Sequence, residues 1–216
     1  MSTKKTRPLR ADAERNRQLL LEAARELFAE RGLHVSLDEI AKHAGVGVGT
    51  AYRRFGSRSE LIEALFDERL EQMLALAEES LQAEDAWQGL TGFIERSTEL
   101  QASNRGLKEI LLGSAEGRQR IADVRRRMQP LGTRLVARAQ QAGVLRSDFV
   151  PQDLPMIQIM LGGIADASAE VDPDLWRRYL SLILAGMRVE GEPVGSAPDW
   201  KAVAGVMDGW RPPRRD

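Results

Sequence analysis

The segment SLDEIAKHAGVGVGTAYRRF, residues 36–55, contains three glycines at alternate positions, at 45, 47 and 49. Such a run could form a phosphate-binding loop. A dinucleotide-binding loop, however, follows a strand and has the spacing G-x-G-x-x-G, and a Walker loop carries Lys followed by Ser or Thr. Here the preceding residues have helical periodicity, and neither pattern is present. The segment therefore gives little support to nucleotide binding.

A helix-turn-helix explains the same residues better. Ser36 followed by Glu39 has the spacing of a capping box, which predicts the start of a short helix. Gly45 supplies a left-handed residue to end that helix. Gly47 is then the N-cap of a second helix that extends to about Phe55, although glycine is a weaker cap than serine.

The second of these helices has two distinct faces. Ala51 and Phe55 are four residues apart and face the core. The opposite, exposed face carries Val48, Gly49, Tyr52 and Arg53. Tyrosine hydroxyls bind phosphate oxygens, arginine can bind guanine with two hydrogen bonds, and glycine lets the backbone approach closely. This face favours insertion into the major groove of DNA over the alternative, a structural helical hairpin with a basic rim.

Charge is distributed unevenly along the chain. Up to Arg58 there are twelve Lys and Arg residues and seven Asp and Glu residues, a net charge of +5, so the remainder carries −6 of the total of −1. This asymmetry is typical of a nucleic-acid-binding module joined to another domain, or of a solvated face with a loose basic tail. We expect a cytoplasmic protein, because no signal peptide or run of about 18 apolar residues is present.

The rest of the chain predicts an all-α protein, since helical periodicity recurs throughout and no period-2 strand pattern appears. A first helix is expected over about 12–31, capped by Asp12. Ser57 and Glu60 form a second capping box, which opens a long fourth helix. Gly143 ends a later helix, and Asp172 followed by Pro173 is expected to cap the last apolar one. We predict three segments: a DNA-binding domain (1–56), a helical effector-binding and dimerisation domain (57–190), and a linker with a C-terminal tail (191–216).

Three segments of the chain together resemble the DNA-binding domain of TetR-family transcriptional regulators. These are LLEAARELFAERG, VSLDEIAKHAGVGVGTAYRRF and SRSELIEALF, and the resemblance covers about residues 17–66. It implies a homodimeric repressor that binds a palindromic operator and is released by a small-molecule effector held in the helical C-terminal domain. We expect no cofactor, and the absence of cysteine together with only two histidines predicts no metal site.

The resemblance also implies roles for individual residues. Val48, Gly49 and Arg53 would lie nearest the base edges. Phosphate contacts would come from Ser36, Thr50, Tyr52, Arg54 and Arg58. From the N-terminal arm, Arg7, Arg10 and Arg17 could reach either the DNA backbone or the minor groove. Arg54 stands where the family often has histidine, so that contact is permanently charged here.

Two apolar helices near the C-terminal end are the candidate dimer interface. The interface residues we expect are Met156, Met160, Gly163, Trp176, Tyr179 and Ile183. The alternative is that both helices only complete the core of the monomer. For an apolar or amphipathic effector, the candidate pocket residues are Met73, Trp87, Phe93, Met128 and Met160, each of which could equally be a core residue.

Two other classes of function remain as alternatives. An enzyme would need a nucleophile, an acid–base pair or a metal. The chain has no cysteine and only two histidines, His34 and His43, which lie in or beside the DNA-binding helices. We therefore expect no enzyme. The second alternative is a helical interaction protein that binds DNA only non-specifically.

Overall fold

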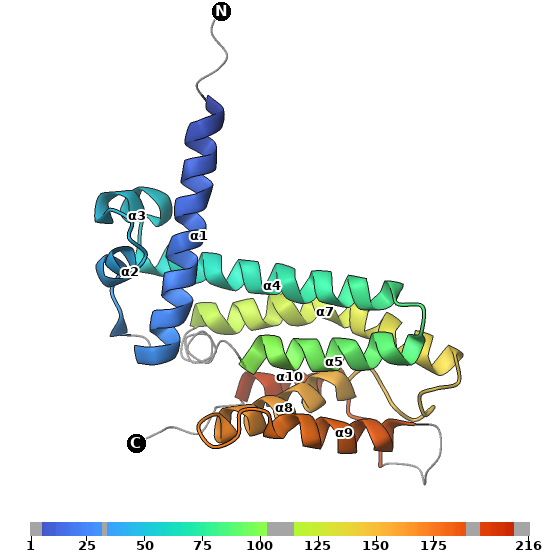
Figure 1. Ribbon diagram of the computed structural model, residues 1–216. Helices are drawn as coiled ribbons and strands as arrows, with labels where there is room; N and C mark the ends of the chain where they lie inside the picture. Colours follow the sequence, from blue (N-terminus) through green and yellow to red (C-terminus); the bar gives the residue numbers. More distant parts are fainter. Residues whose placement is uncertain (1–5, 32–33, 103–114, 189–194, 210–216) are drawn as a thin grey trace, which may run out of the picture. The chain divides into compact units, whose positions relative to one another are not determined.

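The computed structural model describes residues 6–31, 34–102, 115–188 and 195–209, and within these ranges it contains helices and no strand. The helices are α1 (Thr6–Arg31), α2 (Leu37–His43), α3 (Val48–Phe55), α4 (Arg58–Gln82), α5 (Ala86–Ala102), α7 (Ala115–Gln141), α8 (Asp153–Ser168), α9 (Leu175–Met187) and α10 (Trp200–Gly209) (Figure 1). The predicted all-α class is confirmed.

The chain divides into two compact units, and the division falls within α4, between Arg69 and Leu70. The first unit contains α1, α2, α3 and the start of α4. The second contains the rest of α4 and helices α5 to α10. The predicted boundary at residue 57 assigns all of α4 to the second domain. Within the predicted tail, residues 200–209 form α10.

The core of the first unit forms around the apolar stripe of α1. The buried side chains of this unit include Leu20, Ala24, Leu27, Phe28, Ile40, Ala41, Ala51, Phe55 and Leu61. Helix α1 begins at Thr6, six residues before the predicted cap at Asp12. Pro8 lies in the first turn of this helix, where its missing N–H removes no intrahelical hydrogen bond, so the helix continues through it. Asp12 is therefore inside the helix, and its predicted capping role is wrong.

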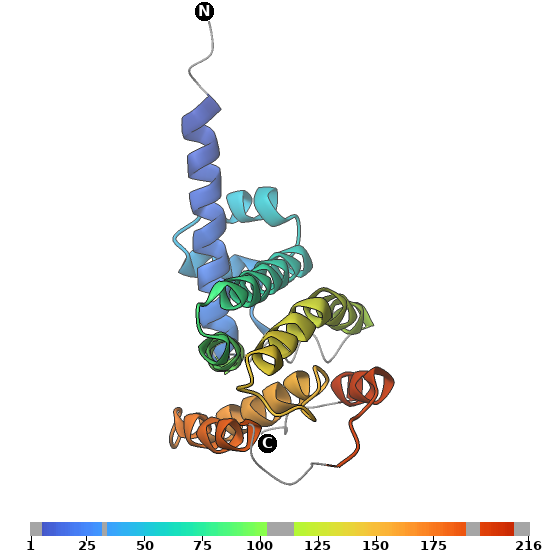
Figure 2. The same ribbon diagram turned by 90° about the vertical axis from the view of Figure 1, so that its right-hand side faces the viewer.

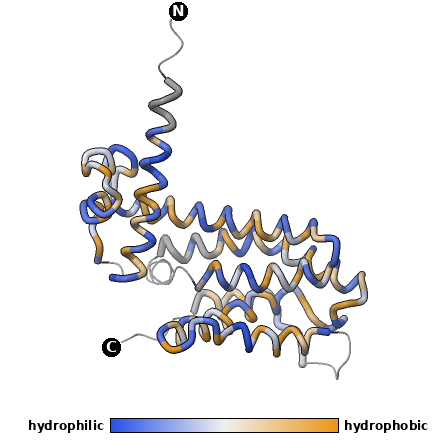
Figure 3. Tube along the Cα trace, viewed as in Figure 1, coloured by the Kyte–Doolittle hydropathy of each residue, from blue (hydrophilic) through white to orange (hydrophobic). Residues whose placement is uncertain are grey.

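The second unit packs α5 between α7 and α8, and α9 lies against α8 (Figure 2). Apolar residues recur every few positions along α4 and α5, as amphipathic helices require (Figure 3). The core contains Leu90, Ile94, Leu135, Leu161 and Trp176. Helix α10 packs on α8 and buries Val203.

Several helices end at a glycine whose φ is positive, a backbone conformation that glycine adopts without strain. Gly45, Gly56 and Gly143 have φ of 65°, 67° and 69°, which confirms the predicted stops at Gly45 and Gly143. The predicted cap of α9 is wrong. Asp172 instead accepts a hydrogen bond from the backbone N–H of Asp174 (3.2 Å) in a turn, and the helix begins at Leu175.

No helix in the described ranges is both long enough and apolar enough to cross a membrane.

Candidate nucleic-acid interface

The start of α2 is held by the predicted capping box. The backbone N–H of Glu39 donates to Ser36 Oγ (3.2 Å), and the Glu39 carboxylate accepts from the backbone N–H of Ser36 (2.8 Å). The pKa of Glu39 is lowered mainly by the hydrogen bond from the Ser36 backbone N–H, and to a smaller extent by the bond from the Ser36 hydroxyl. The capping box is confirmed, and it fixes the direction in which α2 leaves the preceding loop.

The turn between α2 and α3 follows the glycine pattern. The backbone N–H of Val46 donates to the Ala41 carbonyl oxygen (2.9 Å), and the Val46 side chain is buried beneath the turn. Gly47 is the N-cap of α3, without a side-chain hydrogen bond. A Cβ atom added to Gly49 would meet no atom within 4 Å. Gly49 therefore leaves the backbone of the first turn of α3 accessible to a partner.

Helix α3 has the two faces that its sequence predicts. Ala51 and Phe55 are buried against the first-unit core. The predicted DNA-facing residues are exposed at Val48, Gly49, Tyr52, Arg53 and Arg54, and Thr50 is half-buried. Val48 and Tyr52 are 40% and 47% exposed, which is high for large apolar and aromatic side chains. Such residues beside two arginines form a surface suited to base edges and phosphates.

The polar side chains of this face already have partners within the first unit. Arg53 Nη2 donates to Thr50 Oγ1 (3.0 Å) one turn earlier. Arg54 Nη2 lies 3.1 Å from Glu14 Oε2 on α1. A hydrogen bond from the Tyr52 hydroxyl to Asp38 on α2 raises the pKa of Tyr52. Glu14 and Asp38 have no local sequence signal as partners of this face, because neither lies close to its partner along the chain.

The remaining predicted phosphate contacts lie at the edges of this face. Arg58 Nε donates to the Val35 carbonyl oxygen (2.8 Å), and its guanidinium group lies 5.6 Å from the centre of the Phe28 ring. It thus attaches the start of α4 to the loop before α2. Arg17 is half-buried and lies 3.9 Å from Glu14. Arg7 and Arg10 belong to α1, but their side chains are outside the described part.

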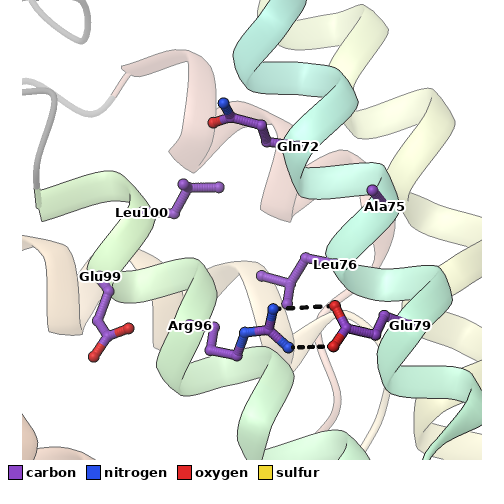
Figure 4. A pocket seen from close by; sticks show the side chains of 7 residues that line it. All are labelled: Gln72, Ala75, Leu76, Glu79, Arg96, Glu99 and Leu100. Carbon is purple, nitrogen blue, oxygen red and sulfur yellow. Dashed lines mark hydrogen bonds and ion pairs between the residues drawn. The ribbon is translucent and has the colours of Figure 1, made fainter.

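The second unit contains an open groove of about 500 Å³ between α4 and α5 (Figure 4). It is lined by Gln72, Ala75, Leu76, Glu79, Arg96, Glu99 and Leu100. Arg96 and Glu79 face each other across one end of it and form two hydrogen bonds of 3.0 Å. These bonds lower the pKa of Glu79.

None of the five predicted pocket residues lines this groove. Phe93 is buried in the second-unit core, Trp87 and Met128 pack against that core, and Met73 is half-buried. Met160 is 52% exposed.

The residues predicted at a dimer interface divide between the surface and the interior of the second unit. Met160 and Tyr179 are exposed, and Met156, Gly163 and Ile183 are half-buried. Leu182, which is not among the predicted interface residues, is 58% exposed on the same helix as Tyr179. Trp176 is only 2% exposed within the single chain, so it supports this surface from beneath.

No group of three or more His, Asp or Glu residues that could hold a metal ion occurs in the part of the chain that the structure describes.

Comparisons with known proteins agree with this geometry. Residues 20–65 match the family model "Bacterial regulatory proteins, tetR family", and residues 85–189 match "Transcriptional regulator SbtR-like, C-terminal domain". The crystal structure of the TetR transcription regulatory protein from Mycobacterium vanbaalenii is 31% identical, with a TM-score of 0.66, over 84% of this chain and 100% of that one. The TetR transcriptional regulator SCO0520 from Streptomyces coelicolor is 30% identical, with a TM-score of 0.62, over 81% and 99% of the two chains.

A curated relative matches over a shorter range. The HTH-type transcriptional regulator SAR0097 of Staphylococcus aureus (strain MRSA252) is 39% identical over 87 residues, which are 39% of this chain and 45% of the relative. The chain thus spans less than half the length of this relative.

Proposed function

Because the chain belongs to the TetR family of DNA-binding transcriptional regulators, we propose that it is a repressor that binds a palindromic operator as a homodimer and is released by a small molecule. A repressor acts on the genome, so we place it in the cytoplasm. The observation that carries the proposal is the exposed face of α3, where Tyr52, Arg53 and Arg54 follow a first turn that Gly49 leaves without a side chain at that position.

On this proposal, α3 is the recognition helix. Val48, Gly49 and Arg53 contact base edges, because they occupy the outward side of its first two turns. Phosphate oxygens are bound around these residues by Ser36, Thr50, Tyr52, Arg54 and Arg58. An arginine with two hydrogen bonds to guanine supplies sequence information, whereas a tyrosine hydroxyl on phosphate supplies position and affinity.

The dimer would form through α8 and α9. Met160 on α8 and Tyr179 and Leu182 on α9 expose apolar area on two helices that pack together. Two copies of this pair, related by a two-fold axis, make a four-helix bundle. Such a dimer presents two recognition helices to half-sites separated by about 34–36 Å, one turn of DNA.

The effector is proposed to be apolar or amphipathic and to bind within the second unit. The groove between α4 and α5 supports this, because its apolar side chains, such as Leu76 and Leu100, are rimmed by charged ones. Release requires that the molecule bind the non-operator conformation more tightly by a few kcal/mol. Operator affinity that does not change at saturating concentration excludes a given molecule as the effector.

The proposal can be tested by selecting binding sites from random-sequence duplexes with the full-length protein. Fluorescence anisotropy then compares the selected duplex with a scrambled duplex across a salt series. We expect a palindromic site and preferential binding. Arg53→Ala should cost about 1–3 kcal/mol and relax specificity, whereas Tyr52→Phe should weaken binding to both duplexes.

Equal affinity for selected and scrambled duplexes would favour the other candidate, a helical interaction protein that binds DNA only non-specifically. In that protein the loss of Arg53 would weaken both complexes to the same extent, since non-specific binding depends on charge alone.

A further inference from the structure

Glu14 connects the first helix to the DNA-facing surface of the third. Its carboxylate lies 3.1 Å from Arg54 Nη2 on α3 and 3.9 Å from Arg17 Nη1 on its own helix, and it accepts a hydrogen bond from Gln18 (3.2 Å). Both views show α3 alongside α1 (Figures 1 and 2). All of these groups belong to the first unit.

The Glu14–Arg54 pair is exposed enough to open easily. The two side chains are 57% and 35% exposed, so water screens the attraction and the pair contributes little to stability. A carboxylate is also a close chemical stand-in for a phosphate, because both offer Arg a pair of anionic oxygens. Glu14 therefore occupies the guanidinium group that a DNA phosphate would bind.

We propose that Glu14 limits DNA affinity by competing with phosphates for Arg54: it holds Arg54 on arbitrary DNA and gives it up where the operator backbone is correctly placed. Non-specific affinity depends on how many phosphates the protein neutralises. An arginine that is already paired with a carboxylate contributes little to this number. At the operator, base contacts hold α3 against fixed phosphate positions, and a phosphate then replaces Glu14. The inference rests on the proposed operator binding.

The test is a double-mutant cycle on the full-length protein, with the selected duplex and a scrambled duplex as probes. The variants are Glu14→Gln, Arg54→Ala and both together. The matched control is Asp12→Asn, which removes the same charge from an exposed site on α1. Asp12 itself forms no ion pair among the described residues. Thermal unfolding checks that each variant is folded.

We expect Glu14→Gln to tighten binding to scrambled DNA about twofold to fivefold, the range of an exposed ion pair. Binding to the selected duplex should tighten at least as much, because only there does the wild-type protein have to break the pair. The salt dependence on scrambled DNA should steepen by about 0.9 in log–log slope for each protomer that gains a phosphate contact. In the Arg54→Ala background, Glu14→Gln should have no more effect than Asp12→Asn.

The inference is overturned if Glu14→Gln behaves like Asp12→Asn with Arg54 present, or if it weakens binding to scrambled DNA. Either result would show that Glu14 acts through bulk charge or only positions α3. Failure of the proposed function has a different signature, because no duplex would then be selected. The cycle on scrambled DNA would still report whether Glu14 restrains Arg54.

Discussion

At the scale of single residues, Ser36 links the stability of α2 to the ionisation of Glu39. Ser36→Ala removes the hydroxyl that accepts from the Glu39 N–H and donates to its carboxylate. We expect a loss of about 1 kcal/mol of unfolding free energy and a rise in the pKa of Glu39 toward its ordinary value. Chemical denaturation and an NMR titration of the Glu39 carboxyl group measure the two effects. Ser59→Ala, an exposed change inside α4, should leave that pKa unchanged.

The pH dependence of this capping box has a definite sign. The folded-state pKa of Glu39 is lowered, so its contribution to stability is present above the unfolded-state pKa and is lost as pH falls through the folded-state value. The stability difference between wild type and Ser36→Ala should therefore shrink in acid. A difference that stays constant down to the lowest pH would show that the bond to the carboxylate contributes nothing.

Tyr52 provides a direct optical measure of its bond to Asp38. The hydroxyl bond to this carboxylate, together with its negative charge, raises the pKa of Tyr52. Asp38→Asn removes the charge, so Tyr52 should ionise at a lower pH. The chain has only two tyrosines, so phenolate absorbance in a Tyr179→Phe background follows Tyr52 alone. An unchanged titration curve would mean that the two groups do not interact in solution.

These residues also show which contacts can be predicted from the sequence and which cannot. The capping box joins positions three apart, so a local pattern was enough to predict it. Glu14 and Arg54 are 40 positions apart, and they meet only because α1 packs against α3. Periodicity shows which side of each helix faces the core, but it does not predict which charged side chains meet at the rim.

At the scale of helices, α5 approaches the end of α4 closely at Gly89. A Cβ atom on Gly89 would overlap the Ser80 carbonyl oxygen. The guanidinium of Arg138 donates to the nearby carbonyl oxygens of Leu81, Ala83 and Glu84. The Leu81 carbonyl is one of those that the end of a helix leaves without an intrahelical partner, and Ala83 and Glu84 follow in the turn after α4. Gly89, which has no side chain, thus lets the two helices meet at this corner, and the Arg138 side chain holds the corner through its hydrogen bonds.

Gly89→Ala should destabilise the protein by about 1–3 kcal/mol, because backbone atoms must move to admit the methyl group. Gly92→Ala is a matched control on the same helix, where the added Cβ would meet no atom within 4 Å. It should be neutral or stabilising by up to about 1 kcal/mol, since alanine favours helix. Urea denaturation measures both. Equal effects of the two substitutions would contradict a close contact at Gly89.

The helices themselves were largely predictable, and the errors fell at their starts. Apolar periodicity and glycine stops identified α2, α3 and the end of α7. Helix α1 begins earlier than Asp12 because a proline in the first turn does not interrupt a helix. Helix α9 begins later than Asp172 because the aspartate side chain bonds within a turn instead of capping the helix.

At the scale of the whole molecule, the first unit was more predictable than the second. The face of α3 could be predicted because exposed Tyr52 and Arg53 need a polar partner. In the second unit, large apolar side chains such as Phe93 and Met128 have the same periodicity whether they line a core, a pocket or an interface. The sequence therefore could not indicate the groove between α4 and α5, which is lined by both apolar and charged side chains.

The proposed dimer gives a prediction for the complete assembly. Met160→Lys places a charge in the centre of the expected α8–α9 interface, where an unpaired buried ion costs several kcal/mol. Sedimentation should show a monomer, and affinity for the selected duplex should fall by more than affinity for scrambled DNA. Val206→Lys is the control, because Val206 is similarly exposed, 48% against 52%, but lies on α10. If Met160→Lys still sediments as a dimer with undiminished operator affinity, the subunits associate through another surface.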